Sequence, residues 1–299
     1  MICNSNCLFK IKLNFTKLHK ENAPTMRIIS FNVNGIRSIK NKTKQGQPLQ
    51  QPEHTSVLQQ LIQEQQPDVL AFQEIKTQSI ADLDFLKPQF PHIFINTAVK
   101  KGYSGTALLT KEEPQEIHYN FDLCEFEQDI TDKSWNQEGR TITAIFESCV
   151  VVTVYVPNSK PKLARIDERL EWEEHLRVYL IQLEMYGRPI ILCGDLNVAP
   201  QPMDIHSKQG ANVAGASPQE RGAFQRLIER FTDSFRHLHP AEQQWSWWSN
   251  FADSRARNKG WRIDLILVST AHKNQIESAA ILPEYHGSDH CPVLLDLMV

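Results

Sequence analysis

The 299-residue sequence has no apolar run of membrane-spanning length, which argues against an integral membrane protein. Its six cysteines include no C-x-x-C pair, and three of them lie in apolar runs where free thiols are commonly buried. We therefore expect reduced cysteines and an intracellular protein, cytoplasmic in a bacterium or nuclear in a eukaryote. The net charge of −3 gives no overall attraction to polyanions, so such a partner would need a locally basic or metal-bearing face.

No repeat and no linker rich in Gly, Ser or Pro divides the chain. Residues 1–25 contain four lysines, one glutamate and no arginine, which is unlike a transit peptide, and their apolar runs are too short for a secretory signal. We expect residues 1–25 to be a poorly ordered extension and residues 26–299 to form one catalytic domain.

Strand-like and helix-like segments alternate along this domain, which predicts a single layered α/β or α+β fold. Residues 41–54 are polar and loop-like. Ser217, Pro218 and Glu220 supply an N-cap, an N1 proline and a capping-box glutamate for one of the helices. The predicted strands are Met26–Val33, Asp68–Phe72, Pro189–Cys193, Arg262–Ser269, Pro292–Met298 and a hairpin over Thr141–Val156; the predicted helices begin near Leu58, at Arg165 (to Tyr186) and at Arg221 (to Phe231).

Polar side chains stand at the mouths of five apolar segments: Asn32 and Asn34, Glu74, Asp195 and Asn197, Asp264, and Asp289 with His290. Such mouths converge on one edge in layered sheet proteins, whereas turn formation alone explains only isolated cases. Carboxylate and amide oxygens suit Mg²⁺, and a set with one histidine and no cysteine disfavours a structural zinc site. Acids, amides, a histidine and a metal together predict the hydrolysis of a phosphate ester.

Nine motifs occur in order: ISFNVNGIRS, DVLAFQEIKT, GYSGTALLTK, EGRTIT, VVTVYVPNS, ILCGDLNVAP, SPQERGAF, NKGWRID and GSDHCPV. Together they resemble the exonuclease III family of apurinic/apyrimidinic (AP) endonucleases, within the endonuclease/exonuclease/phosphatase superfamily. The resemblance covers roughly residues 26–299. GDLN and SDH alone indicate only the superfamily, whereas YVPN, PQER and NKGWR indicate its DNA-repair branch.

The resemblance implies a four-layer α/β sandwich, with two packed mixed β-sheets flanked by helices. It also implies a monomeric, Mg²⁺-dependent nuclease, in which Mn²⁺ can substitute. Its partner would be duplex DNA with abasic or 3′-blocked sites. It would cleave 5′ to an abasic site and leave a 3′-hydroxyl, with accompanying 3′-phosphodiesterase and 3′→5′ exonuclease activity.

The resemblance also implies residue roles. Glu74 matches the principal metal ligand, with Asn32 and Asp289 supporting the metal and its waters. Asp195 matches the group that activates the attacking water, with Asn197 beside it, and both also belong to the implied metal set. The remaining implied catalytic residues are Tyr155, Asp264 and His290, with Asp264 pairing with His290. The implied substrate-binding residues are Asn34, Arg37, Lys76, Tyr103, Arg140, Asn158, Asn212, Trp247, Trp261 and Arg262.

Two positions depart from the family pattern. Asn34 stands where some members have an aspartate ligand, so we expect one tight metal site. Family members often carry a basic residue shortly after YVPN, and in this sequence Lys160 and Pro161 occupy that stretch, so the match of the basic residue is open.

Four tryptophans and four basic residues cluster in QQWSWWSNFADSRARNKGWR. Trp247 and Trp261 fall where the family builds an apolar pocket for an extruded abasic sugar, and Phe251 is a further candidate. Arg255, Arg257, Lys259 and Arg262 predict local positive charge for phosphates. The alternative is that the tryptophans belong to the core and that the basic residues form a solvated loop. A core position is plausible for Trp248, whereas for Trp261 we favour the pocket.

Ser288, Asp289 and His290 are the residue types of a serine hydrolase triad. Three adjacent residues cannot form such a relay, because nucleophile, base and acid must approach from different parts of a fold. We therefore expect Ser288 to be a turn residue and the attacking group to be water. The functional alternatives are another reaction of the superfamily, on RNA tails or on inositol or lipid phosphates, and a DNA-binding protein that has lost catalysis.

Overall fold

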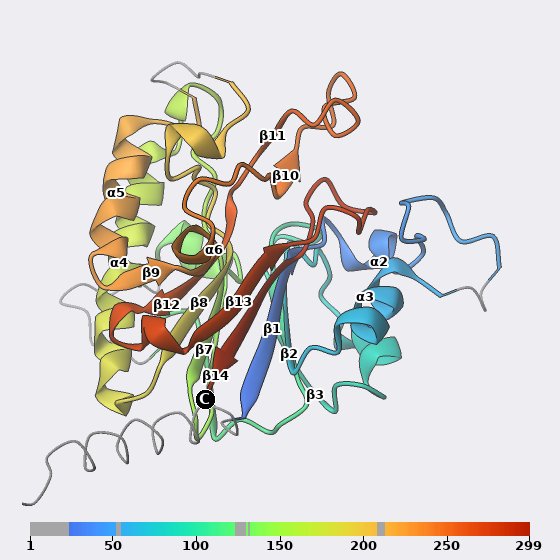
Figure 1. The fold of residues 1–299 in the computed structure, drawn as a ribbon, viewed down its shortest axis with the longest axis horizontal. Helices are drawn as coiled ribbons and strands as arrows, with labels where there is room; N and C mark the ends of the chain where they lie inside the picture. The colour runs from blue at the N-terminus through green and yellow to red at the C-terminus, as the bar shows by residue number, and fades with distance from the viewer. Residues whose placement is uncertain (1–23, 52–54, 123–129, 131, 208–212) are drawn as a thin grey trace, which may run out of the picture.

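The computed structural model describes residues 24–51, 55–122, 130, 132–207 and 213–299, which form two packed six-stranded sheets with helices on their outer faces (Figure 1). The first sheet has the order β13 (Ile276–Ile281), β14 (Val293–Met298), β1 (Thr25–Asn32), β2 (Val69–Gln73), β4 (Thr106–Thr110) and β3 (His92–Asn96). The second has the order β5 (Glu116–Tyr119), β6 (Thr141–Ile145), β7 (Val150–Tyr155), β8 (Ile190–Asp195), β12 (Asp264–Ser269) and β9 (Phe231–Asp233). A separate ribbon pairs β10 (Trp247–Trp248) with β11 (Gly260–Trp261).

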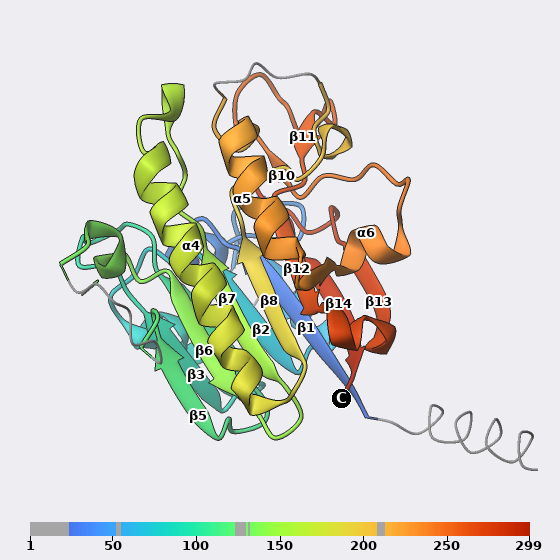
Figure 2. The same cartoon turned by 90° about the vertical axis from the view of Figure 1, so that its left-hand side faces the viewer.

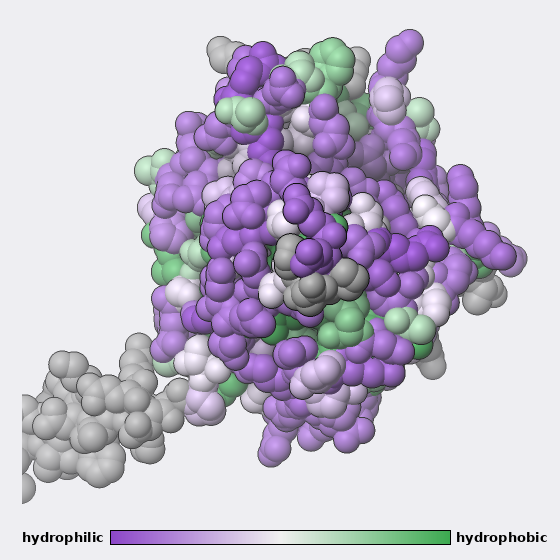
Figure 3. Space-filling model, turned by 90° about the vertical axis from the view of Figure 1, so that its right-hand side faces the viewer, coloured by the Kyte–Doolittle hydropathy of each residue, from purple (hydrophilic) through white to green (hydrophobic). Residues whose placement is uncertain are grey.

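Helices cover the outer face of each sheet, which completes four layers. The first sheet packs against α2 (Ile36–Ile39), α3 (Val57–Gln65) and the 3₁₀-helix η1 (Ile80–Leu86). The second packs against α4 (Ile166–Leu183) and α5 (Pro218–Ile228), which run side by side in Figure 2. The short helix α6 (Ser234–Leu238) packs near β12 and β13. The opposite side of the molecule, seen in Figure 3, is mainly hydrophilic. The predicted four-layer α/β sandwich is confirmed.

Alternating side chains along the strands build the separate apolar layers. On β1, Ile28 packs between the two sheets, whereas its neighbour Ile29 packs toward α3. On β7, Val151 points between the sheets and Val152 packs toward α4. Because successive strand residues point to opposite faces, strands covered on both sides read as continuous apolar runs. This explains why the predicted strands show little polar alternation.

Strand direction brings the polar segment ends together. β1 runs parallel to β2 in the first sheet, and β7 runs parallel to β8 in the second. The chain therefore leaves each parallel pair at one edge of its own sheet, and the hydrogen bond between Asn32 at the end of β1 and Asp195 at the end of β8 shows that the two edges coincide. β12 runs antiparallel to β8 and pairs Asp264 with Asp195, so β12 begins at this edge.

The predicted elements are present, with differences at their ends. The capping box of Ser217 and Glu220 is formed, but α5 starts at Pro218 and stops at Ile228. Phe231, predicted as the last residue of that helix, instead begins β9 because it pairs with Ser269 of β12. Residues 1–23 of the predicted extension lie outside the described residues.

Three cysteines, Cys149, Cys193 and Cys291, are buried free thiols. Within the described part of the chain, no helix is both long and apolar enough to cross a membrane.

Gly194 offers a test of the close contact between β7 and β8. A Cβ atom at Gly194 would lie 1.9 Å from the carbonyl oxygen of Val154, and the backbone has a φ of +149°. Gly194→Ala should therefore lower the free energy of unfolding by about 3 kcal/mol or more, from overlap and backbone strain. Gly222 in α5 is the matched control, since no atom lies within 4 Å of an added Cβ. Gly222→Ala should stabilise by about 0.5–1 kcal/mol. Urea denaturation of both variants measures this, and equal effects would contradict it.

Candidate active site

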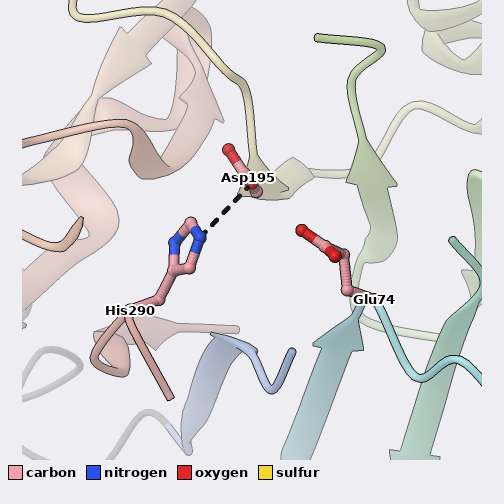
Figure 4. Close-up of side chains that lie close together, drawn as sticks. All are labelled: Glu74, Asp195 and His290. Carbon is pink, nitrogen blue, oxygen red and sulfur yellow. Dashed lines mark ion pairs between the residues drawn. The ribbon is translucent and has the colours of Figure 1, made fainter. Parts of the chain in front are cut away.

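Three ionisable side chains meet at the edge of the sandwich where the parallel strands end. Glu74 follows β2, Asp195 is the last residue of β8, and His290 precedes β14. Ligand atoms of these three residues all lie within 4.8 Å of one another. Figure 4 shows the carboxyl groups and the imidazole ring directed toward one shared space. The two sheets thus supply separate parts of a single cluster.

Asn32 joins the two carboxylates across the sheets. Its fully buried side-chain amide nitrogen donates to Glu74 Oε1 at 3.1 Å and to Asp195 Oδ2 at 3.0 Å. The amide oxygen accepts from the backbone N–H of Asn34 at 3.0 Å, which holds the group in this orientation. A single residue at the end of β1 therefore sets the spacing of the two acids.

His290 is paired with Asp264, as the family resemblance implied. Its Nδ1 lies 2.8 Å from Asp264 Oδ2. Ser246, a buried residue that we did not predict, positions this pair: its Oγ accepts from the backbone N–H groups of Ile263 and Asp264. It was missed because only the tryptophans around it carried a readable signal.

The charge states of the cluster follow from burial and from these pairings. Burial lowers the pKa of His290, but the adjacent Asp264 outweighs it and raises that pKa to about 10. Burial raises the pKa of Asp195 to about 7, with the charge of His290 acting in the opposite direction. For Glu74, burial acts upward, but Lys76, whose Nζ lies 2.8 Å from Glu74 Oε2, outweighs it and the pKa is lowered. A protonated imidazole therefore faces Asp195 at 3.9 Å.

The donor set fits a hard divalent cation. A protonated His290 cannot coordinate a metal, which leaves the oxygens of Glu74 and Asp195 as the ligands of the three-residue cluster. Asp289 lies outside this cluster. Its Oδ1 accepts from Asn34 Nδ2 at 2.8 Å and its Oδ2 accepts from Trp247 Nε1 at 3.2 Å.

A pocket of about 710 Å³ opens above the cluster. One wall is apolar and aromatic: Trp247 and Trp261 meet edge to face with ring centroids 5.9 Å apart, beside Ile263 and Gly215. The floor and the other wall are polar, and they are formed by Glu74, Tyr155, Asn158, Lys160, Lys162, Asp195, Asn197, Asp289 and His290. Trp248 is buried, in line with our expectation, and so is Trp245. Phe251 is 80% exposed and does not line this pocket.

The segments after β7 and β8 are hydrogen-bonded to each other. Asn158 Nδ2 donates to Asn197 Oδ1 at 2.8 Å, and Asn197 Nδ2 donates to the Val156 carbonyl at 2.9 Å. Asp195 Oδ1 accepts from the Asn197 backbone N–H at 2.9 Å. Burial and the nearby Glu74 raise the pKa of Tyr155, so its phenol stays neutral. These contacts hold three neutral polar residues, Tyr155, Asn158 and Asn197, in the lining of the pocket.

Arg140 and Tyr103 lie behind Tyr155. The guanidinium of Arg140 is 4.6 Å from the Tyr155 ring centroid and donates to the Tyr155 carbonyl and to the Tyr103 hydroxyl. Arg140 is buried, so it acts on the pocket through Tyr155.

The remaining predicted substrate residues have different surroundings. Lys76 also donates to Asn34 Oδ1. Arg37 is exposed and lies 3.7 Å from Asp82. Asn212 lies outside the described residues.

Two of the four basic residues expected to attract phosphates bind other groups of the protein instead. Arg262 is 1% exposed and pairs with Asp204 and Asp233 at 2.8 Å each. Arg255 donates to four backbone carbonyls, those of Pro283, Tyr285, Ser288 and His290. Arg257 and Lys259 are exposed. The structure therefore gives no geometric support for direct phosphate contact by Arg262 or Arg255.

The sequence and the fold are similar to those of known nucleases. The pattern of the endonuclease/exonuclease/phosphatase family matches residues 29–290. An exodeoxyribonuclease of Bacillus subtilis (strain 168) is 45% identical over 273 residues, which are 90% of this chain and 98% of the relative. The DNA repair nuclease APEX1 of Danio rerio is 36% identical over 284 residues, 93% and 84% of the two chains. The crystal structure of AP endonuclease LMAP from Leishmania major has a TM-score of 0.76 and 25% identity, covering 92% of this chain and 88% of its own.

The charge on His290 can be tested by removing its partner's charge with Asp264→Asn. The folded pKa of His290, about 10, lies above the reference value of 6.5. The charged pair therefore contributes stability that is fully present below about pH 6.5 and is lost as the pH rises toward 10. In metal-free protein, Asp264→Asn should lower the His290 pKa in an NMR titration. The loss of stability above neutral pH should also be smaller in urea denaturation. The other histidine signals are internal controls, and an unshifted His290 pKa would contradict the pairing.

Proposed function

Because the chain belongs to the endonuclease/exonuclease/phosphatase family, we propose that it is a DNA-repair nuclease that hydrolyses the phosphodiester 5′ to an abasic site in duplex DNA and leaves a 3′-hydroxyl. The observation that carries the proposal is a single pocket in which a carboxylate cluster and a His–Asp pair face a tryptophan wall. The cluster supplies the phosphodiester chemistry. The wall supplies selection for a sugar that lacks its base.

The tryptophan wall suits an extruded abasic sugar. Trp247 and Trp261 offer ring surface without a charged group, and Ile263 and Gly215 extend that apolar side. Extrusion of an abasic nucleotide from the duplex costs less free energy than extrusion of a paired one, because no base pair is broken. The bare sugar can then lie against the apolar rings. RNA tails and inositol phosphates have no bare abasic sugar, so contact with the tryptophan wall would not strengthen their binding.

The polar side of the pocket has the groups that phosphodiester hydrolysis requires. Asp195, with a pKa raised to about 7, accepts a proton from the attacking water, and Asn197 orients that water. The imidazolium of His290 donates to the scissile phosphate, where negative charge develops in the transition state. Tyr155 and Asn158 donate from the adjacent wall.

Mg²⁺ is the proposed cofactor, with Mn²⁺ as a substitute. Glu74 and Asp195 would hold it, with Asn32, Asn197 and Asp289 supporting the metal or its waters. When bound, the ion neutralises phosphate charge and helps to orient water. The absence of an acid at Asn34 favours one tight site.

The same pocket suits related substrates at DNA ends. We include 3′-phosphodiesterase activity in the proposal, because a 3′ blocking group is also a phosphate-linked fragment without a paired base, and 3′→5′ exonuclease activity, because it hydrolyses the same type of phosphodiester bond at a DNA end. We propose that the protein acts as a monomer on duplex DNA. It would act where the genome is, in the cytoplasm of a bacterium or the nucleus of a eukaryote.

Incubation with a duplex that carries one abasic site tests the function directly. With Mg²⁺ we expect a nick 5′ to the site and a 3′-hydroxyl that a DNA polymerase extends. EDTA should abolish the nick, and the same duplex with an intact base should show no internal nick at that position. Polyadenylated RNA and inositol phosphates serve as competing substrates. An uncut abasic duplex, or faster turnover of a competing substrate, would overturn the proposal.

Asp195→Asn tests the proposed chemistry separately from the activity. The amide keeps the shape of the carboxylate but cannot take a proton, so the turnover number should fall about 10²–10⁴-fold. Asp84→Asn is the matched control, because Asp84 is exposed and its ion pair within the described part of the chain is with Lys87, outside the pocket. Single-turnover nicking rates measure both variants. Unchanged nicking by Asp195→Asn would show that another group activates the water.

A further inference from the structure

Arg169 lies on α4, outside the pocket, yet its side chain is fully buried. Its Nη1 donates to the carbonyls of Pro157 at 3.0 Å and Asn197 at 3.1 Å, and its Nη2 donates to the Leu196 carbonyl at 2.9 Å. One guanidinium therefore binds three backbone carbonyls in two separate loops. Those loops follow β7 and β8 and carry the pocket residues Asn158 and Asn197.

Glu220 extends this arrangement to a third loop. It is also fully buried, and Arg169 Nη1 lies 3.8 Å from its Oε1. Its carboxylate accepts from the Gly215 N–H at 2.8 Å, the Ser217 hydroxyl at 2.7 Å and the Ser159 hydroxyl at 2.6 Å. A capping box needs only the contact at the helix start. The bonds to Gly215 and Ser159 reach the wall behind Trp261 and the loop after β7.

A buried ion pair is weak evidence for stability by itself, because apolar residues can often replace it without loss. The distribution of the bonds is more informative here. The hydrogen bonds of the Arg169 guanidinium to the Pro157, Leu196 and Asn197 carbonyls all end on loops that carry pocket residues, while its Nε lies 3.4 Å from Glu173 Oε2 on the same helix. The planar fork of arginine presents donors from three nitrogen atoms in a fixed plane, whereas the three donors of lysine all radiate from one nitrogen atom and cannot span carbonyls of separate loops in the same way.

We propose that Arg169 and Glu220 form a brace, meaning a buried pair whose hydrogen bonds hold the three loops in place. The brace positions Asn158, Asn197 and Gly215 around the substrate, and so sets the turnover number of the nuclease. This rests on the proposed function. Both residues are positioning residues, since neither lines the pocket. Displacement of a catalytic group by about 1 Å relative to the substrate can lower the rate on the order of 100-fold, so loss of the brace should lower the turnover number.

Arg169→Lys keeps the charge and removes the fork. We expect kcat on abasic duplex to fall roughly 10- to 100-fold, with KM nearly unchanged, because binding surface is retained while alignment is lost. Arg177→Lys is the matched control on the same helix, since among the described residues the ion pair of Arg177 is with Glu174 at the surface, away from the pocket. It should leave both constants unchanged. In Arg169→Lys, hydrogen exchange without DNA should be faster around residues 156–159, 196–199 and 213–216, and unchanged in the sheets.

Ser159→Ala is the second variant, because it removes one bond of the brace at little risk to folding. Its kcat should fall by a smaller factor, with faster exchange in the same loops. The brace is refuted if folded Arg169→Lys has the kcat and loop exchange of the wild type. If Arg169→Lys does not fold, wild-type kcat in Ser159→Ala refutes it. Failure of the wild-type protein to cut abasic DNA would refute the proposed function instead, and the exchange measurement would still decide whether the loops are braced.

Discussion

The hydrogen bonds of the Asn32 amide to Glu74 and Asp195 are the contact on which the site depends. Each acid ends or follows a strand of a different sheet, so nothing in either sheet alone would fix their separation. Two carboxylates held this close repel each other, and burial of Asp195 makes its ionised form more costly still. A neutral donor between them, with Lys76 and His290 on the flanks, lets both acids remain in place.

Four arginines near the pocket bind protein groups rather than facing solvent. Arg169 and Arg255 donate to carbonyls in the segments around the pocket, Arg140 donates to the Tyr155 carbonyl at the end of β7, and Arg262 is enclosed by two aspartates. A guanidinium suits this role because it offers five donors in a rigid plane and cannot lose its charge. Attraction of DNA must then come from cations at the rim, where Lys160 and Lys162 line the pocket and Arg257 and Lys259 are exposed. A chain with a net charge of −3 can therefore still present a local cationic border.

The convergence of the polar residues was predictable because strand-end positions depend on local sequence and on parallel pairing. The pairs β1–β2 and β7–β8 place Asn32, Glu74 and Asp195 at one edge, as their positions along the chain indicated. The internal use of Arg255 and Arg262 was not predictable. Their partners lie 28 or more residues away and include backbone carbonyls, which leave no trace in composition or periodicity. The predicted end of α5 was wrong for a related reason: Phe231 fits the helical spacing of the sequence, but in the structure it pairs with β12 as part of a strand.

The motif Ser288–Asp289–His290 shows why geometry decides between two chemistries with the same residue types. Ser288 Oγ donates to the Asn32 carbonyl at 2.8 Å and accepts from the backbone N–H of His290, so both bonds of this hydroxyl stabilise the turn. The ring of His290 points instead to Asp264 on one side and Asp195 on the other. A serine nucleophile requires a neutral histidine nitrogen within reach of its hydroxyl, and neither condition is met here. An imidazolium facing a carboxylate of raised pKa suits a reaction in which the acid takes a proton from water and the histidine steadies the phosphate.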